Sequence, residues 1–62
     1  MSARELQVLQ LMAGGLTNEQ IGKLLDISIE TVKTHVRHIL DALAALNRTH
    51  AVAIGLRTKV IA

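Results

Sequence analysis

The sequence predicts an all-α fold in which four helices form one domain over residues 1–62. Apolar residues recur at helical spacing in four successive segments, and helix-capping residues precede these segments. With 62 residues, the chain is long enough for one domain only. Half of the residues are apolar, which argues against disorder. Phe, Tyr and Trp are absent, so the core must consist of aliphatic residues and Met.

The first helix is expected over residues 3–13. Ser2 and Glu5 have the spacing of a capping box, in which each side chain accepts a hydrogen bond from the other residue's backbone N–H. Gly14 and Gly15 should end the helix, because glycine adopts the left-handed conformation that terminates helices. The apolar face should comprise Leu6, Leu9 and Ala13, with Val8 and Met12 beside it.

The second helix is expected over residues 18–25, where Thr17 and Gln20 repeat the capping-box spacing. Gly22 is unusual inside a helix, because glycine there costs roughly 1 kcal/mol relative to alanine. Close approach by another helix would compensate for this cost. The apolar stripe should be formed by Ile21, Leu24 and Leu25.

The third helix, over residues 29–43 with Ser28 as its N-cap, is the most amphipathic segment. Within about 100° of arc it gathers the apolar residues Ile29, Val32, Val36, Ile39, Leu40 and Leu43. The opposite face carries Glu30, Lys33, Thr34, Arg37, His38 and Asp41.

The fourth helix is expected over residues 48–58, with Asn47 as its N-cap. Its apolar residues do not share one side. One face comprises Ala51, Val52, Gly55 and Leu56, whereas Ile54 projects near Arg57 and Thr58. An apolar residue on a polar face is a candidate contact for a second subunit, although a lone exposed apolar residue is equally ordinary.

Charge is distributed unevenly along the chain. Residues 1–30 contain two basic and four acidic residues, whereas residues 31–62 contain five basic residues and one acidic residue. A basic half suits a polyanionic partner. The absence of Cys excludes disulfides, thiolate catalysis and Cys-based zinc sites, and is compatible with a cytoplasmic location. No apolar run reaches the roughly 18 residues that a membrane span requires.

Neither catalysis nor metal binding is expected. A chain of 62 residues offers little room for a cleft that could hold a nucleophile and a base, so an enzyme is not predicted. His35 and His38 have a spacing that a metal site could use, but only His50 remains as a third ligand. A partly buried His35 is the better interpretation, and we expect no metal and no cofactor.

The second and third helices are separated by a three-residue turn, Asp26 to Ser28. Gly22 and Val32 lie ten residues apart, a spacing that favours a helix-turn-helix with a close crossing. In such a motif the N-terminal half of the second helix enters the DNA major groove. The side chains presented to the bases would be Glu30, Lys33, Thr34 and Arg37. Free N–H groups at helix starts would meet phosphates near Thr17, Asn18 and Thr31.

Three runs, TNEQIG at residues 17–22, Ile27-Ser28 and TVKTHV at residues 31–36, resemble the C-terminal DNA-binding domain of the LuxR/NarL (GerE-type) regulators. The segments SARE at residues 2–5, with Val8-Leu9, and NRTHAV at residues 47–52 are similar to that family's first and fourth helices. The resemblance implies a four-helix helix-turn-helix domain, winged-helix-like but without a wing.

The resemblance also implies function. The family binds double-stranded promoter DNA as a homodimer and acts with RNA polymerase, in the cytoplasm. A receiver or ligand-binding domain normally precedes this domain, and none is present in the chain. Base contacts would match Lys33, Thr34 and Arg37. Phosphate contacts would come from helix starts and from flanking residues, here Thr17, Asn18, Thr31, His38 and Arg48. Dimer contacts would come from the fourth helix, at Ala51, Ile54, Arg57 and Thr58.

Several residues depart from the family pattern. Glu19 stands where Lys is common, which places one phosphate contact in doubt. Ala44 and Ala45 replace a common Gly, so the bend after the third helix is expected to differ. His50 replaces a frequent Glu, so the fourth helix should lose a capping-box acid.

Two alternatives remain open from the residues. A sigma-factor region 4 type domain shares the fold and the reading helix, but would bind its promoter element while attached to RNA polymerase. The second alternative is a protein-interaction module on the same scaffold. Glu19, Glu30 and Asp41 give it some support, because they reduce the net positive charge of the basic face. Such a module would show no salt-dependent affinity for DNA.

Overall fold

The computed structural model describes all 62 residues and contains four α-helices and no strand. The helices are α1 (Ala3–Ala13), α2 (Asn18–Leu25), α3 (Ile29–Leu43) and α4 (Arg48–Arg57). The predicted boundaries of the first three helices are confirmed. The fourth helix ends one residue earlier than predicted, because Thr58 caps it and Lys59 takes a left-handed conformation (φ 61°).

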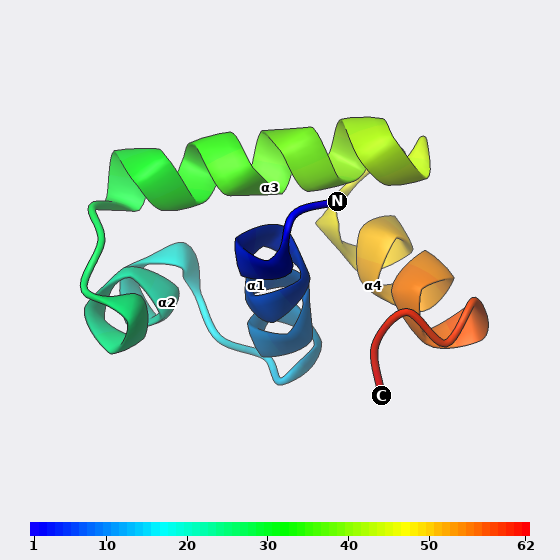
Figure 1. Cartoon of the computed structure of the whole chain (residues 1–62), viewed down its shortest axis with the longest axis horizontal. Helices are drawn as coiled ribbons and strands as arrows, with labels where there is room; N and C mark the ends of the chain where they lie inside the picture. The colour runs from blue at the N-terminus through cyan, green and yellow to red at the C-terminus, as the bar shows by residue number, and fades with distance from the viewer.

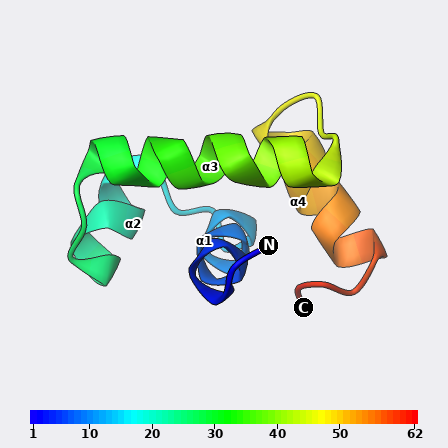
Figure 2. The same cartoon turned by 45° about the horizontal axis from the view of Figure 1, so that its top comes forward.

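The longest helix, α3, lies across the other three (Figures 1 and 2). It has α2 under its start, α1 under its middle and α4 under its end. Helix α3 contacts all three of the others, and α1 also packs against α4. The arrangement leaves the outer side of α3 uncovered along its whole length.

The core contains only aliphatic residues and Met, as the composition requires. Its eight buried members are Val8, Leu9, Met12, Ile21, Val32, Ile39, Ala51 and Ile61. Complete burial of an aliphatic side chain of this size contributes about 1.5–3 kcal/mol. Because these residues come from all four helices and the C-terminal tail, the core joins every element of the fold.

Three residues predicted on apolar faces are exposed instead. Leu24 is 62% exposed. The side of α2 that the rest of the domain covers carries Ile21 and Gly22, and Leu24 lies beyond the edge of that side. Ile29, at 40%, is the first residue of α3 and lines an open hollow beside the start of α2. Leu56, at 47%, lies one position beyond Gly55, whose side of α4 is covered by the C-terminal tail.

All four predicted N-caps are confirmed. Each cap side chain accepts a hydrogen bond from the backbone N–H three residues ahead, at 2.8–3.2 Å, and the caps are Ser2, Thr17, Ser28 and Asn47. The reciprocal bonds of both predicted capping boxes are also present. The expected weakening at His50 is corrected in part, because its Nδ1 accepts a hydrogen bond from the Leu46 N–H at 2.9 Å.

The junction between α3 and α4 bends the chain by 55°. Ala44 makes this bend in a left-handed conformation (φ 51°, ψ 40°), which costs a non-glycine residue about 1–2 kcal/mol. The turn therefore forms without the glycine that the family commonly has. No single helix is long and apolar enough to cross a membrane, although α3 and α4 meet those criteria together as this bent pair.

The C-terminal tail packs back onto α1, a contact that no local sequence pattern indicates. Ile61 is buried, and its side chain lies 3.1 Å from the position that a Cβ on Gly55 would occupy. The side-chain amide of Gln10 donates to the Ala62 carbonyl at 3.0 Å and accepts from the Ala62 N–H at 3.3 Å. Gly55 thus provides the space that the tail fills.

Gly22 is confirmed as a point of close approach, but the approaching group differs from the one expected. A Cβ at this position would lie 2.8 Å from the Ile27 carbonyl oxygen, which belongs to the turn and not to another helix. The Val32 side chain follows at 3.7 Å. Gly22 also accepts a hydrogen bond from the Ile27 N–H at 2.9 Å, so the turn folds directly onto α2.

We expect Gly22→Ala to lower the free energy of unfolding by about 1–3 kcal/mol, because the new methyl group collides with backbone that cannot move alone. Gly14→Ala is the matched control, since its Cβ would meet its nearest neighbour at 3.4 Å, an ordinary contact, in a right-handed conformation. Chemical denaturation of both variants measures the difference. Equal stability of the two variants would contradict this account of the turn.

Candidate nucleic-acid interface

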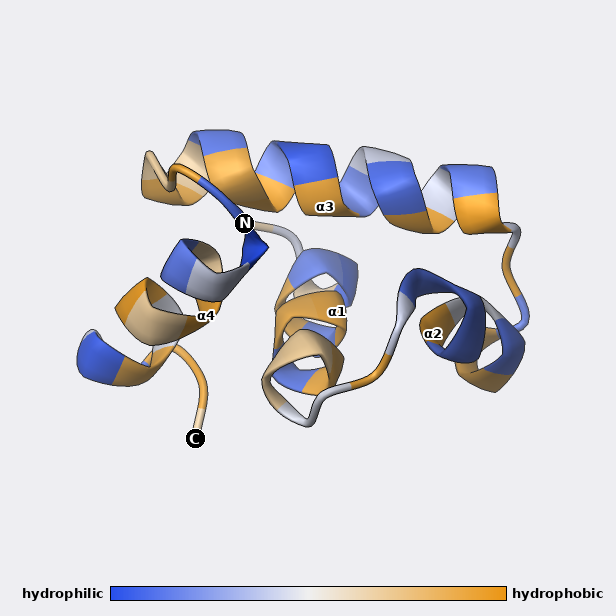
Figure 3. Cartoon of the chain, turned by 180° about the vertical axis from the view of Figure 1, so that it is seen from behind, coloured by the Kyte–Doolittle hydropathy of each residue, from blue (hydrophilic) through white to orange (hydrophobic).

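The outer face of α3 is polar from end to end, whereas its inner face is apolar (Figure 3). Val32 and Ile39 are completely buried on the inner side. Residues 30, 33, 34 and 37 have the i, i+3, i+4, i+7 spacing that places side chains on one side of a helix. Glu30, Lys33 and Arg37 are exposed there. The structure therefore brings all four expected base-contact residues onto one face.

Lys33 and Glu30 form an exposed ion pair, with Nζ and Oε1 3.6 Å apart. The side chains are 58% and 84% exposed, respectively. Ion pairs at such exposure stabilise a fold by at most about 1 kcal/mol. Lys33 can therefore leave Glu30 for another acceptor at little cost, and Glu30 is equally free to accept from another donor.

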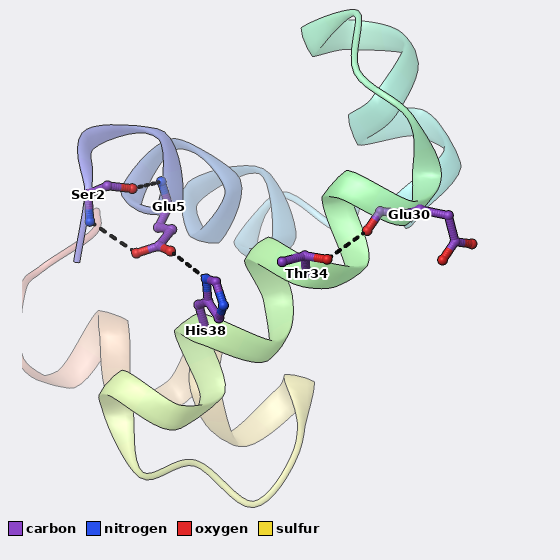
Figure 4. A network of polar contacts seen from close by, with 5 residues as sticks. All are labelled: Ser2, Glu5, Glu30, Thr34 and His38. Carbon is purple, nitrogen blue, oxygen red and sulfur yellow. Dashed lines mark hydrogen bonds and ion pairs between the residues drawn. The ribbon is translucent and has the colours of Figure 1, made fainter.

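Thr34 is half-buried and its hydroxyl donates to the Glu30 carbonyl oxygen at 3.1 Å (Figure 4). The hydroxyl hydrogen is thus used within the helix. Thr34 retains its methyl group and the acceptor capacity of its oxygen for contacts outside the helix.

A shallow hollow joins the starts of α2, α3 and α4. Its lining residues are Thr17, Asn18, Glu19, Ile29, Glu30, Lys33 and Arg48. Five of these were predicted as DNA contacts from different parts of the sequence, so the fold brings them together. The other four predicted contacts, Thr31, Thr34, Arg37 and His38, lie outside the hollow. Glu19 and Ile29 also line the hollow, although neither was predicted as a DNA contact.

Arg48 ties the start of α4 to the segment that begins α2. Its guanidinium donates to the Asn18 side-chain oxygen at 2.5 Å and to the Leu16 carbonyl oxygen at 2.6 Å. Partial burial lowers the pKa of Arg48 from its ordinary value, but a guanidinium stays charged. Two predicted phosphate contacts, Arg48 and Asn18, are therefore bonded to each other, and Arg48 keeps further N–H donors.

Two other predicted phosphate contacts also have partners within the protein. The Thr31 hydroxyl lies 2.9 Å from the Ser28 hydroxyl at the exposed start of α3. His38 Nδ1 lies 3.3 Å from Glu5 Oε2, across from α3 to α1 (Figure 4). His38 remains 55% exposed, so its ring is held by Glu5 on one side and open to solvent on the other.

Glu5 serves two elements at once. Its second carboxylate oxygen accepts a hydrogen bond from the Ser2 N–H at 3.0 Å (Figure 4). This backbone hydrogen bond lowers the pKa of Glu5 below its ordinary value of 4.5, and His38 lowers it further. The carboxylate thus caps α1 and holds α1 against α3.

The three histidines have separate roles. His35 is half-buried, as expected, and its Nδ1 is buried without a hydrogen-bond partner. His50 uses Nδ1 to cap α4, and His38 faces Glu5. No group of three potential ligands in the described chain could hold a metal ion.

One predicted dimer contact is corrected. Ala51 is completely buried in the core, because its face of α4 packs against the rest of the domain, so it is unavailable to a second subunit. Ile54 is half-buried, and Thr58 donates its hydroxyl to the Ile54 carbonyl at 2.8 Å. Arg57 and Thr58 are exposed. A second exposed stripe on α4, missed in the sequence, consists of Thr49, Ala53 and Leu56.

Comparison with known proteins gives a consistent result. The family described as "Bacterial regulatory proteins, luxR family" matches residues 1–55. The chain is 50% identical over 58 residues to the uncharacterized transcriptional regulatory protein YxjL of Bacillus subtilis (strain 168), covering 94% of this chain and 27% of that protein. It is 43% identical over 61 residues to the transcriptional regulatory protein LiaR of the same organism, covering 98% and 29%.

A solved structure is also similar. The response regulator ChrA of a heme-sensing two-component system superposes with a TM-score of 0.93 at 43% sequence identity. The match covers 97% of this chain and 30% of ChrA. The chain therefore spans less than a third of the length of each of these three relatives.

We expect Glu5→Gln to lower the melting temperature at neutral pH, because it removes the carboxylate that bonds Ser2 and His38. Since folding lowers the pKa of Glu5, its stabilisation is complete above about 4.5 and is lost as the pH falls through the folded-state value. The difference from the wild type should therefore shrink in acid, as measured by thermal unfolding at a series of pH values.

His38→Gln serves as the control, since it leaves the larger contribution from Ser2 in place. The stability of this variant should therefore fall in acid by most of the amount that the wild type loses. A Glu5→Gln deficit that stays constant throughout the acid range would contradict the assigned role of Glu5.

Proposed function

The chain belongs to the luxR family of bacterial regulatory proteins and is the DNA-binding domain of a transcription regulator; from this premise we propose that it reads double-stranded promoter DNA with α3 in the major groove, as a homodimer. The family membership confirms the expected resemblance and the expectation that the chain is not an enzyme. It also favours the regulator over the sigma-factor alternative.

The observation that carries the proposed binding mode is the uncovered outer face of α3. An α-helix fits the major groove, and its N-terminal half leads in helix-turn-helix proteins. Lys33 lies on that half and Arg37 directly follows it, and both are exposed cations that can donate to guanine. Thr34 offers a methyl group for thymine, and Glu30 can accept from the cytosine amino group.

The phosphate contacts follow from the hollow beside this face. We assign them to Thr17, Asn18 and Arg48 at its rim, and to Thr31 and His38 along α3. The starts of helices carry free N–H groups and a partial positive charge, which suits phosphate oxygens. Arg48 and Asn18 can share a phosphate while they remain bonded to each other, because the guanidinium has five N–H donors.

We assign the dimer contact to α4. Its exposed residues Thr49, Ala53 and Leu56 follow the four- and three-residue spacing with which two helices pack together. Ile54, Arg57 and Thr58 flank this stripe. A single domain offers few phosphate contacts, so a pair of domains on two half-sites would hold DNA far more strongly.

This chain spans less than a third of the length of its relatives, so we propose that it is part of a longer regulator. In the proposed whole protein, a receiver or ligand-binding domain controls whether the DNA surface or the dimer forms. The protein works in the cytoplasm, where promoter DNA and RNA polymerase are found, and it needs neither a membrane nor a cofactor.

The double variant Lys33→Ala, Arg37→Ala should lose sequence preference among genomic DNA fragments, because each specific base contact contributes about 1–3 kcal/mol. Titrations at two salt concentrations measure affinity and its salt dependence. The matched control, Arg4→Ala with Lys59→Asn, removes the same charge from α1 and the tail, and Asn tolerates the left-handed conformation of Lys59. The control should keep its sequence preference. Absence of binding by folded wild-type protein at low salt would instead support the protein-interaction module.

Leu56→Asp should raise the dimer dissociation constant by about tenfold or more, since it places a charge in an apolar contact. Ala42→Asp adds the same charge at an exposed position of α3 and should have little effect. Sedimentation of the three proteins up to millimolar concentration measures the change. A strictly monomeric wild type over that range would count against α4 as a dimer contact.

A further inference from the structure

Glu19 occupies an unusual place at the interface. It is the second residue of α2, it is exposed, and it lines the hollow that contains three of the predicted phosphate contacts, Thr17, Asn18 and Arg48. The backbone N–H groups of Asn18 and Glu19 donate no hydrogen bond within the protein, because the capping box uses those of Thr17 and Gln20. A phosphate that reaches these free amides would approach the Glu19 carboxylate as well.

The cations around the hollow do not neutralise Glu19. Lys33 is paired with Glu30 at 3.6 Å. Arg48 is bonded to two neutral oxygens, on Asn18 and Leu16. Glu19 itself forms no ion pair. Two carboxylates and two cations thus line the hollow, which leaves it with no net formal charge.

We propose that Glu19 is an affinity-lowering residue, whose carboxylate repels the DNA phosphate nearest the start of α2. This inference rests on the proposed function. Repulsion at this point weakens the hold of a single domain on any duplex. Stable occupation of DNA then depends on two domains bound together, which ties DNA binding to dimer formation.

The effect of Glu19 should be independent of DNA sequence. Phosphates carry no sequence information, so a residue that repels them lowers the affinity for every duplex by the same factor. Glu30, on the reading face, would instead change the preference between sequences. The two carboxylates of the hollow can therefore be distinguished by experiment.

The test measures the binding of the 62-residue chain to a random-sequence duplex and to a preferred genomic fragment. Removal of one like charge about 4 Å from a phosphate in water should tighten binding roughly fivefold at low salt. Glu19→Gln should show this gain equally on both DNAs, and Glu19→Lys should show a larger one. The gain should fall as salt rises, because the Debye length shortens to about 8 Å at 0.15 M.

Asp26→Asn is the matched control, because it removes the same charge from an exposed position at the opposite end of α2, and Asn tolerates the left-handed conformation there. Thermal unfolding of each variant checks that the fold is retained. If Glu19→Gln and Asp26→Asn change affinity equally, or if Glu19→Gln changes only the preference between the two DNAs, the inference is overturned while the proposed function stands. If folded wild type and variants all fail to bind duplex, the proposed function is overturned and this inference with it.

Discussion

The structure depends on the one-sided burial of α3. This helix packs against all three others, and it does so through an apolar stripe centred on Val32 and Ile39. Burial of that stripe positions α2, α1 and α4 in turn along its length. One face of α3 is buried in the core, and the opposite face is polar and exposed to solvent. The same constraint that stabilises the domain therefore creates its reading surface.

The hollow at the helix starts follows from two short connections. The turn between α2 and α3 folds onto Gly22, which brings the beginning of α3 beside α2. The bend at Ala44 sends α4 back under α3, and Arg48 then binds the segment before α2. Three helix starts converge as a result. Their caps satisfy some of the terminal N–H groups, and the remaining N–H groups face the surface where a polyanion would lie.

The parts of this structure that were predictable from sequence are those governed by near neighbours. Each N-cap acts on a residue three positions ahead, and the apolar period of a helix spans a few residues, so both are visible in the sequence. The contacts that were missed join distant residues. Arg48 binds Asn18, Gln10 binds Ala62, and His38 binds Glu5, and no local pattern indicates these partners. Solvent exposure was harder to predict. The apolar period placed Leu24 and Ala51 on apolar faces of their helices, but it did not show which of these faces the rest of the domain covers.

The most direct test of the account is NMR titration of the isotope-labelled chain with double-stranded DNA. The account predicts that the largest changes in backbone amide shifts fall at residues 17–19, along the outer face of residues 30–37, and at Arg48. Amides on the exposed side of α1 should change little. Changes confined to α1 and the C-terminal tail, with α3 unaffected, would contradict the claim that the uncovered face of α3 reads DNA.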